Sequence, residues 1–432
     1  MPSRLTQVLT LIAWGLAFYA SGTVHTQTTK RPMALVDLLN IPRVGDPQIS
    51  PDGSAITFML TTPDWRANRR VAHLWRINTD GSGLRRLSNE PGAPPSARWS
   101  PDSSTIAFLS GGSVYVMSAG GGTPRQVSKR TGVTEIAWHP GGQFIYFLAV
   151  DAPSDADRAR ESLRGDVVVL DETRPRHLWR ISVADGAESR VTTGSDYVFA
   201  YRIAARGDRI IVSRRPTRLP ADSDRMELWN IAADGSVPIQ LTKNAVPEED
   251  GELAPDGSQV LFVARANHRQ QPYYNANLFL VPAAGGRVRA LMPDFPHEVL
   301  RAGWAADSKS IWMIVNTGVR IDLFQVDLAS PQPRQITRGD HAIVPPYWSS
   351  VRNRHVFMID EPTRIGDIWT WAPGDTSPRR VTGIYDYLDR DFALPRQELV
   401  EWKGHDGTRI EGVLTYPIDY KPGTRYPLVV QL

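Results

Sequence analysis

Few residues of this chain combine a type and a spacing that could do chemistry. Glu248-Glu249-Asp250 is an acidic triplet before a predicted strand, and it could bind an amino group if it faced a channel. An exposed charged loop is the default for such a run, and we predict one here. His405 and Asp406 are adjacent, but they fall in a predicted hairpin turn, which suggests solvent exposure rather than catalysis. His139 stands in a repeated turn, so we expect a turn residue rather than a ligand.

The composition excludes several kinds of site. The chain has no cysteine, so disulfides, thiolate nucleophiles and cysteine-bound zinc are ruled out. Its Asp-Gly pairs lack the D-x-D-x-D-G spacing of a calcium loop. The net charge of +3 comes from both signs spread along the chain, which does not support a nucleic-acid partner. We therefore assign no catalytic, cofactor-binding or metal-binding residue and expect no cofactor.

A repeated turn organises the chain. Residues 97–109 read as a short strand, a tight turn and a second strand, in which Pro101 fixes φ and Asp102 can accept from backbone N–H groups. A glycine follows the aspartate at Gly53 and Gly257, where a left-handed conformation costs little. Versions of this turn recur at residues 50–53, 100–103, 139–142, 205–208, 254–257, 305–308 and 349–352.

Each turn leads into a second element, which is an apolar strand, a small loop and a strand ending in Thr or Ser. Examples end at Ser88, Thr192, Thr242, Thr337 and Thr382. Seven copies of four short strands, repeating every 40–50 residues or so, predict an all-β, seven-bladed β-propeller. Because one small sheet cannot cover both of its faces, the blades must stack on their neighbours. A β-sandwich with similar turns is the alternative, which seven copies of a two-part motif disfavour.

The two ends of the propeller, predicted at residues 46–383, fall in different blades when the repeats are read in phase. The first strand lies near residues 47–49 and the last near residues 379–381. We therefore predict that no terminal strand completes the sheet at the opposite end. The ring should close only by packing between the first and last blades.

Two units carry insertions. Residues 61–72 lengthen a loop in the first blade, and residues 151–176 add a charged helix at 154–164, with Ser154 as N-cap, and an extra strand at 167–170. We predict that the larger insertion decorates a blade edge. A cover over a substrate entrance is the functional alternative.

The first 22 residues resemble a secretory signal. Arg4 gives a positive start, residues 8–20 form an apolar run, and small residues at 20–22 offer a cleavage site. The apolar run is shorter than the roughly 20 residues that cross a bilayer. We therefore expect a periplasmic or secreted protein with no membrane contact after cleavage. Residues 23–45 form a lead segment, whose short helix at 34–39 should pack under the first blade.

The pattern changes after residue 383. Residues 384–395 read as a linker, and residues 398–417 as two alternating strands joined by the Asp406-Gly407 turn, which predicts a hairpin. Residues 426–432 form a continuous apolar run, typical of a strand buried on both faces. We therefore predict that residues 384–432 contain a linker and the first strands of an α/β domain.

The motifs of this region resemble the entry into the α/β-hydrolase domain of the prolyl oligopeptidase family of serine peptidases. The resemblance rests on Trp402-Lys403, Asp406-Gly407, Ile410, Gly412 and the run from Tyr426 to Val430. Residues 37–53 and 177–179 resemble the acylaminoacyl-peptidase and dipeptidyl-aminopeptidase branch. The resemblance implies an exported serine peptidase whose propeller covers the active site and admits short or unfolded peptides.

That family needs a serine on a G-x-S-x-G elbow, an aspartate and a histidine. The 432 residues contain no G-x-S-x-G, and they stop where the family's His-Gly-Gly loop would begin. We therefore carry over no catalytic residue and expect a propeller truncated before the catalytic motifs, inactive as it stands, whose peptide substrates are handled by the missing catalytic domain. The alternative is a free-standing, TolB-like periplasmic propeller that binds protein partners, with the tail pairing to an edge strand.

Overall fold

The computed structural model describes residues 30–88, 97–165, 167 and 174–431. The predicted signal at 1–22 and most of the predicted strand at 167–170 lie outside these residues. Within them the fold is mainly strands, with the helices α1 (Leu35–Asn40), α2 (Asp155–Arg164) and α3 (Asp386–Asp391) and the 3-10 helix η1 (Pro220–Arg225). The all-β class is confirmed. None of the described helices is long and apolar enough to cross a membrane.

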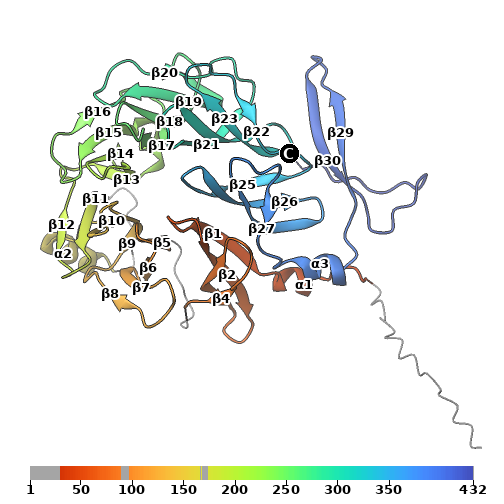
Figure 1. Ribbon diagram of the computed structural model, residues 1–432, viewed down its shortest axis with the longest axis horizontal. Helices are drawn as coiled ribbons and strands as arrows, with labels where there is room; N and C mark the ends of the chain where they lie inside the picture. Colours follow the sequence, from red (N-terminus) through yellow and green to blue (C-terminus); the bar gives the residue numbers. More distant parts are fainter. Residues whose placement is uncertain (1–29, 89–96, 166, 168–173, 432) are drawn as a thin grey trace, which may run out of the picture.

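Within the described part of the chain, seven four-stranded antiparallel units, here called blades, follow one another around a ring (Figure 1). Blade 1 consists of β1 (Arg43–Ile49), β2 (Ala55–Asp64), β3 (Arg69–Asn78) and β4 (Arg85–Arg86), and blade 2 of β5 (Arg98–Trp99), β6 (Thr105–Ser110), β7 (Ser113–Ser118) and β8 (Arg125–Gln126). Blade 3 consists of β9 (Val133–Trp138), β10 (Phe144–Val150), β11 (Arg176–Ser182) and β12 (Glu188–Arg190), and blade 4 of β13 (Tyr197–Ile203), β14 (Arg209–Arg215), β15 (Glu227–Ala232) and β16 (Ile239–Gln240). Blade 5 consists of β17 (Glu248–Leu253), β18 (Gln259–Ala266), β19 (Pro272–Pro282) and β20 (Arg289–Ala290), and blade 6 of β21 (Glu298–Trp304), β22 (Ser310–Asn316), β23 (Ile321–Asp327) and β24 (Arg334–Gln335). Blade 7 consists of β25 (Ala342–Val351), β26 (Arg354–Glu361), β27 (Arg364–Trp371) and β28 (Arg379–Arg380).

The blades are separate sheets, with two exceptions. Blades 3 and 4 are joined by a single parallel pair between Arg176 and Tyr197, and blades 6 and 7 by a pair between Ile321 and Ala342. Each join is confined to one residue pair, so the seven-unit repeat is preserved. The predicted propeller fold is therefore confirmed.

The repeated turn has the predicted local cause. In blade 1 the Gly53 N–H donates to the Ser50 carbonyl at 2.8 Å, and Gly53 has a φ of 74°. The Asp52 carboxylate accepts from the Ser54 N–H at 3.0 Å. The hydrogen bond from Ser50 also lowers the pKa of Asp52. A short side-chain network thus fixes the turn that joins the first two strands of a blade.

The hydroxyl residue that follows the fourth strand in six of the blades also has a structural cause. In six blades of the described chain this hydroxyl accepts from the backbone N–H of an apolar residue in the third strand, at 2.8 to 3.0 Å. The pairs are Ser88 with Leu74, Ser128 with Val114, Thr192 with Leu178, Thr242 with Leu228, Thr337 with Leu323 and Thr382 with Ile368. The fourth strand is short, so this bond extends its pairing.

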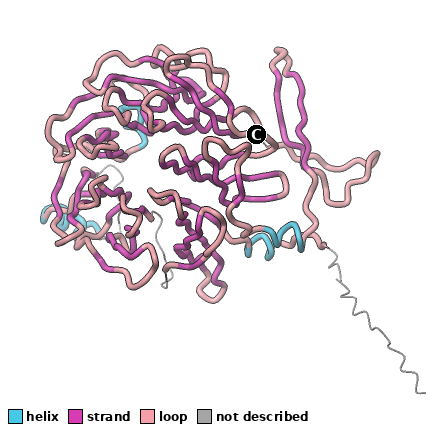
Figure 2. The backbone as a smooth tube through the Cα atoms, in the orientation of Figure 1, coloured by secondary structure: helices cyan, strands magenta, loops and turns pink. Residues whose placement is uncertain are grey.

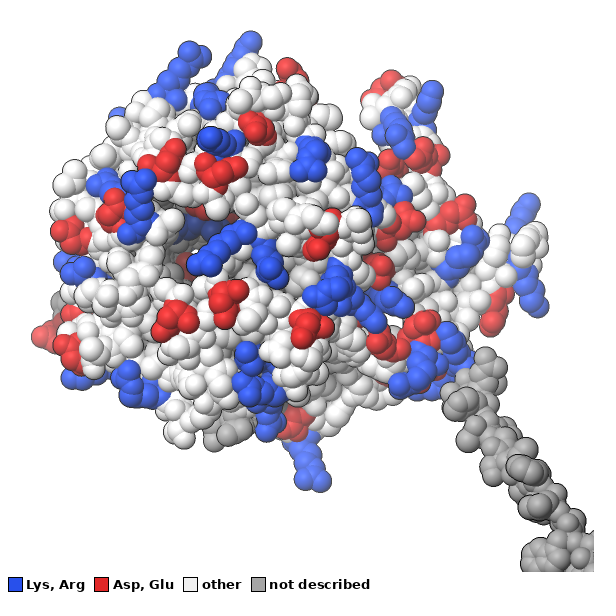
Figure 3. Space-filling view, in the orientation of Figure 1, with Lys and Arg blue, Asp and Glu red and all other residues white. Residues whose placement is uncertain are grey.

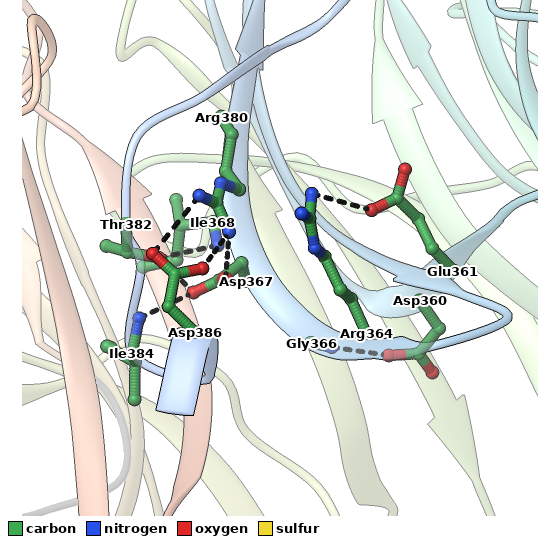
Figure 4. Close-up of polar contacts among 10 residues, drawn as sticks. All are labelled: Asp360, Glu361, Arg364, Gly366, Asp367, Ile368, Arg380, Thr382, Ile384 and Asp386. Atoms are coloured by element: carbon green, nitrogen blue, oxygen red, sulfur yellow. Dashed lines mark hydrogen bonds and ion pairs between the residues drawn. The ribbon is translucent and has the colours of Figure 1, made fainter. Parts of the chain in front are cut away.

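Removal of the Thr382 hydroxyl should destabilise blade 7. This hydroxyl accepts from the Ile368 N–H at 2.9 Å and donates to the buried Asp367 carboxylate at 2.8 Å (Figure 4). We expect Thr382→Val to lower the free energy of unfolding by about 1–3 kcal/mol, because it leaves both groups without this partner. Thr382→Ser keeps the hydroxyl and is the matched control. Equal urea midpoints for the two variants would contradict this role.

The core lies between neighbouring blades rather than within one of them. Phe262 and Phe279 of blade 5 stack with ring centroids 5.3 Å apart, and they pack against Ile211 and Leu228 of blade 4. The other buried clusters likewise draw on adjoining blades, as where Val116 meets Phe147. This arrangement buries both faces of each small sheet.

The ring closes without a shared strand, as predicted. Strand β1 pairs with β2, and β28 pairs with β27, so neither end of the ring contributes a strand to the other's sheet. Blades 1 and 7 are joined instead by a buried cluster that includes Phe58, Val356 and Ile368. Tyr385, the residue immediately before helix α3, also belongs to this cluster. Its hydroxyl accepts from the Val44 N–H and donates to the Pro42 carbonyl, both at 3.1 Å.

The insertions and the lead helix differ in how they pack. In the first insertion β2 and β3 extend into a long hairpin, and Trp65 donates to the Asn40 side chain at the end of α1. Helix α2 matches the predicted helix, with the Asp157 N–H donating to the Ser154 hydroxyl at 3.1 Å. Helix α1 forms, but Leu35 and Val36 are 73% and 52% exposed, so the expected packing under blade 1 is wrong.

The tail forms the predicted hairpin but not the predicted buried strand. Strands β29 (Gln397–Lys403) and β30 (Arg409–Thr415) pair with each other and project from the ring (Figure 1). Residues 424–431 are loop in Figure 2, and Val429 is 88% exposed. The strand prediction for this apolar run is therefore wrong for the described residues. A strand of this kind needs sheet neighbours, and no described strand pairs with it.

Candidate functional site: a charged central cavity

A cavity of about 680 Å³ lies at the centre of the ring, walled mainly by the first strand of each blade. Side chains of both signs line it, among them Asp46, Arg98, Glu135, Arg202 and Asp250. Figure 3 shows charged side chains around a hollow in this face of the molecule. The innermost strands therefore present a mixed polar wall, while their other faces supply the core between blades.

Three of the carboxylates occupy one repeated position. Asp46, Glu135 and Asp250 each stand four residues before the first residue of the repeated turn, in blades 1, 3 and 5. Each also lies at a β-bulge, where the register with the second strand shifts. Their φ angles are 47°, 49° and 54°, a left-handed region that non-glycine residues rarely adopt. The bulge turns these side chains out of the regular alternation of the strand.

Arginines from the intervening blades neutralise two of these carboxylates. Arg98 of blade 2 lies 3.0 Å from Asp46, and Arg301 of blade 6 lies 2.8 Å from Asp250. Arg202 of blade 4 lies 3.3 Å from the same Asp250 carboxylate. These ion pairs join blade 1 to blade 2, and blade 5 to both of its neighbours.

Glu135 differs from the other two. It has no hydrogen-bond or ion-pair partner among the described residues, and its side chain is exposed to the cavity. Its position inside the ring raises the pKa of its carboxyl, an effect that Arg176 and Arg98 oppose. A carboxylate of this kind is able to accept from a donor that enters the cavity.

The acidic triplet is not the exposed loop that the sequence indicated. Its residues belong to β17, and Glu248 is only 1% exposed. Burial raises the pKa of Glu248 to about 8, while Glu249 is exposed and Asp250 faces the cavity. The reason is that β17 already begins at Glu248, and its bulge points the three acidic side chains in different directions. Gly251 permits the bulge, since a Cβ there would lie 2.9 Å from Leu228.

Both histidines lie in the turns that the sequence predicts. His139 accepts from the Gly141 N–H at 3.0 Å within its turn, and its other ring nitrogen lies 3.0 Å from the Gly207 carbonyl. His405 and Asp406 lie in the hairpin turn, where Asp406 accepts from the Thr408 N–H. Within the residues that the structure describes, no group of three or more potential ligands could hold a metal ion.

Sequence reasoning missed Glu135 and its arginine neighbours. One signal could have found them, namely the fixed distance of Asp46, Glu135 and Asp250 from the repeated turn. The cavity holds charged groups but no nucleophile, base and orienting group in a row. Its charged groups can bind a ligand that carries complementary charges.

No family model matches the chain. It is 24% identical to dipeptidyl-peptidase 5 of Porphyromonas gingivalis over 91% of its own length and 62% of the relative's. An acylaminoacyl peptidase solved with a chloromethyl ketone superposes with a TM-score of 0.69 at 16% identity, over 90% of this chain and 60% of that one. The β-propeller domain of the Trilobed protease from Pyrococcus furiosus, described as having an open velcro topology, gives 0.59 at 15% identity, over 80% and 97%. The resemblance predicted from the motifs of this chain is thereby confirmed.

Proposed function

Because the chain resembles the propeller part of prolyl oligopeptidase family peptidases, we propose that it serves an exported serine peptidase that acts on short peptides. In this proposal the ring controls access to a catalytic domain that contributes the serine, aspartate and histidine. The observation that carries it is the order of elements, in which seven blades lead directly into the hairpin β29–β30. The chain spans about 62% of the length of a curated relative, the dipeptidyl-peptidase 5 of Porphyromonas gingivalis.

The apolar surface of the tail supports this proposal. Trp402 and Val413 of the hairpin are 50% and 51% exposed, and Leu428 to Val430 are also exposed. Exposed apolar surface on this scale is a common sign of an interaction face. A catalytic domain that continues the hydrolase motifs would cover it.

The central cavity supports the access role. Ion pairs between neighbouring blades cross-link the wall at Asp46 and Asp250. Because these links hold neighbouring blades together along the wall, they resist the opening of the ring that a folded protein would need, whereas a single extended peptide is far narrower.

The free-standing alternative is not favoured. It predicts that the tail serves the propeller, for example by pairing with an edge strand. Strands β29 and β30 instead form a two-stranded sheet of their own.

The reading frame downstream of codon 432 tests this proposal. We expect it to encode a His-Gly-Gly loop and a later G-x-S-x-G. We also expect the extended protein, isolated from the periplasm, to cleave dipeptidyl fluorogenic substrates. Replacement of that serine by alanine should abolish cleavage, and the 432-residue chain should show none. A stop codon directly after Leu432, or clear cleavage by this chain alone, would overturn the proposal.

A further inference from the structure

The central cavity contains one charge of each sign without a partner. Glu135 of blade 3 and Arg352 of blade 7 both line it, and neither has a hydrogen bond or ion pair with a described residue. Asp46 and Asp250, which occupy the same repeated position as Glu135, are paired with arginines. The two unpaired groups therefore stand out from an otherwise balanced wall.

The backbone at Glu135 strengthens this contrast. A left-handed, non-glycine conformation is strained, and such strain persists where the surrounding structure or a ligand compensates for it. At Asp46 and Asp250 the bulge brings the carboxylate to an arginine of the next blade. At Glu135 the same bulge directs a carboxylate toward the cavity without a protein partner.

The nearest cations are engaged elsewhere. Arg98 donates to Asp46 at 3.0 Å and to the Ala97 carbonyl at 2.9 Å. Arg176 donates to the Val198 carbonyl at 2.8 Å and lies over the Tyr197 ring, 4.4 Å from its centroid. Neither guanidinium is positioned to pair with Glu135 as the structure stands.

The two unpaired groups lie on opposite sides of the ring. Blades 3 and 7 are separated by three blades in one direction around the ring and by two in the other (Figure 1). Both residues line the cavity, which therefore lies between them. Arg352 is part of the turn between β25 and β26, at the edge of the cavity. A ligand that contacts both groups must therefore extend across the bore and carry opposite charges at its two ends.

We propose that this cavity binds short peptides as zwitterions, with the α-ammonium group at Glu135 and the α-carboxylate at Arg352. The cavity of about 680 Å³ lies within the range of sites that bind small molecules. A carboxylate pairs well with an ammonium group, and a guanidinium can hold a carboxylate with two parallel hydrogen bonds. The site lies in the propeller wall, so binding can be tested on this chain alone, and failure here would leave the test of the proposed function untouched.

Isothermal titration with trialanine measures the proposed binding directly. N-acetyl-trialanine and trialanine amide each remove one terminal charge, and each should bind about tenfold or more weakly than trialanine. Glu135→Gln should weaken trialanine by a similar factor and should abolish the preference for a free amino group. Arg352→Gln should likewise abolish the preference for a free carboxylate.

Matched controls separate this site from a general charge effect. Glu249→Gln and Arg354→Gln alter exposed neighbours that do not line the cavity, and trialanine should bind both as it binds the wild type. Circular dichroism and thermal midpoints establish that every variant is folded. The proposal is overturned if wild-type protein does not bind trialanine at millimolar concentration, if a cavity variant keeps its terminal preference, or if a control variant loses as much affinity.

Discussion

Tyr385→Ala is expected to lower the free energy of unfolding by about 3–5 kcal/mol, because it removes a large buried side chain where the ring closes. Tyr385 is 4% exposed and lies in the cluster that joins blades 1 and 7. No β-strand crosses this junction, so side-chain packing carries the closure. The other junctions benefit from a continuous chain between blades, which this one lacks.

Tyr385→Phe isolates the hydroxyl. That group links the Val44 N–H to the Pro42 carbonyl, and its loss should cost about 1–3 kcal/mol because both backbone groups lose this partner. Burial raises the pKa of Tyr385 to about 12, so the phenol stays protonated and can donate at neutral pH.

Tyr387→Phe is the control, since Tyr387 lies two residues further along, in helix α3, and is only partly buried. It should change stability by less than about 0.5 kcal/mol. Urea unfolding measures each variant, and amide exchange at Val44 should accelerate in Tyr385→Phe. Equal stability and equal exchange in the two phenylalanine variants would show that the hydroxyl does not help to close the ring.

The fold could be predicted because its causes are local and repeated. Ser50, Pro51, Asp52 and Gly53 fix a turn through contacts within four or five residues, and the same pattern recurs along the chain. The terminal hydroxyl of six blades is also visible in the sequence, although its partner in the third strand is not. Repetition made the number of blades readable before any contact was known.

The site could not be predicted in the same way. Glu135 is notable only because Arg98 and Arg176 make other contacts, and those contacts join residues far apart in the chain. The bulge that directs it to the cavity depends on register with the second strand. The expectation that a run of acidic residues forms an exposed loop was also wrong at Glu248, because the surrounding blades bury its carboxyl.

The apolar tail shows a different limit. Residues 426–430 have the pattern of a central strand, and the pattern states what such a segment would need rather than what it has. With no strand beside them, Leu428 and Val429 remain 72% and 88% exposed. The apolar run therefore indicated which family the chain resembles. Its own conformation is a loop, because no described strand lies beside it to pair with.

Glu248→Gln should stabilise the protein increasingly as the pH rises from 6.5 to 8. The Glu248 carboxyl accepts from Thr242 at 3.0 Å and from Asn244 at 2.6 Å. Burial first, and then the neighbouring Glu227, raise its pKa to about 8 against the hydrogen bonds from Asn244 and Thr242, which lower it. The folded state thus holds a proton that the unfolded state, with a pKa near 4.5, has already released.

The sign of the pH effect follows from this difference. A pKa that is higher in the folded state gives stability that is complete below about pH 4.5 and is lost as the pH rises toward 8. At about 1.4 kcal/mol per pH unit, this group should cost the wild type about 2 kcal/mol between pH 6.5 and 8. The buried His355 affects stability in a lower pH range. Burial lowers its pKa to about 3, so the stability that its neutral form gives is complete above about pH 6.5 and is lost as the pH falls toward 3.

Urea unfolding of both proteins at pH 6.5, 7.25 and 8 measures the difference directly, since groups common to both cancel in the comparison. Glu161→Gln on the exposed face of α2 serves as the control and should follow the wild type at every pH. A Glu248→Gln difference that stays constant over this range would show that Glu248 is ionised in the folded state. A difference that grows with pH would instead identify this carboxyl as a group that blade 5 keeps protonated, because Thr242, Asn244 and Glu227 offer it no cation.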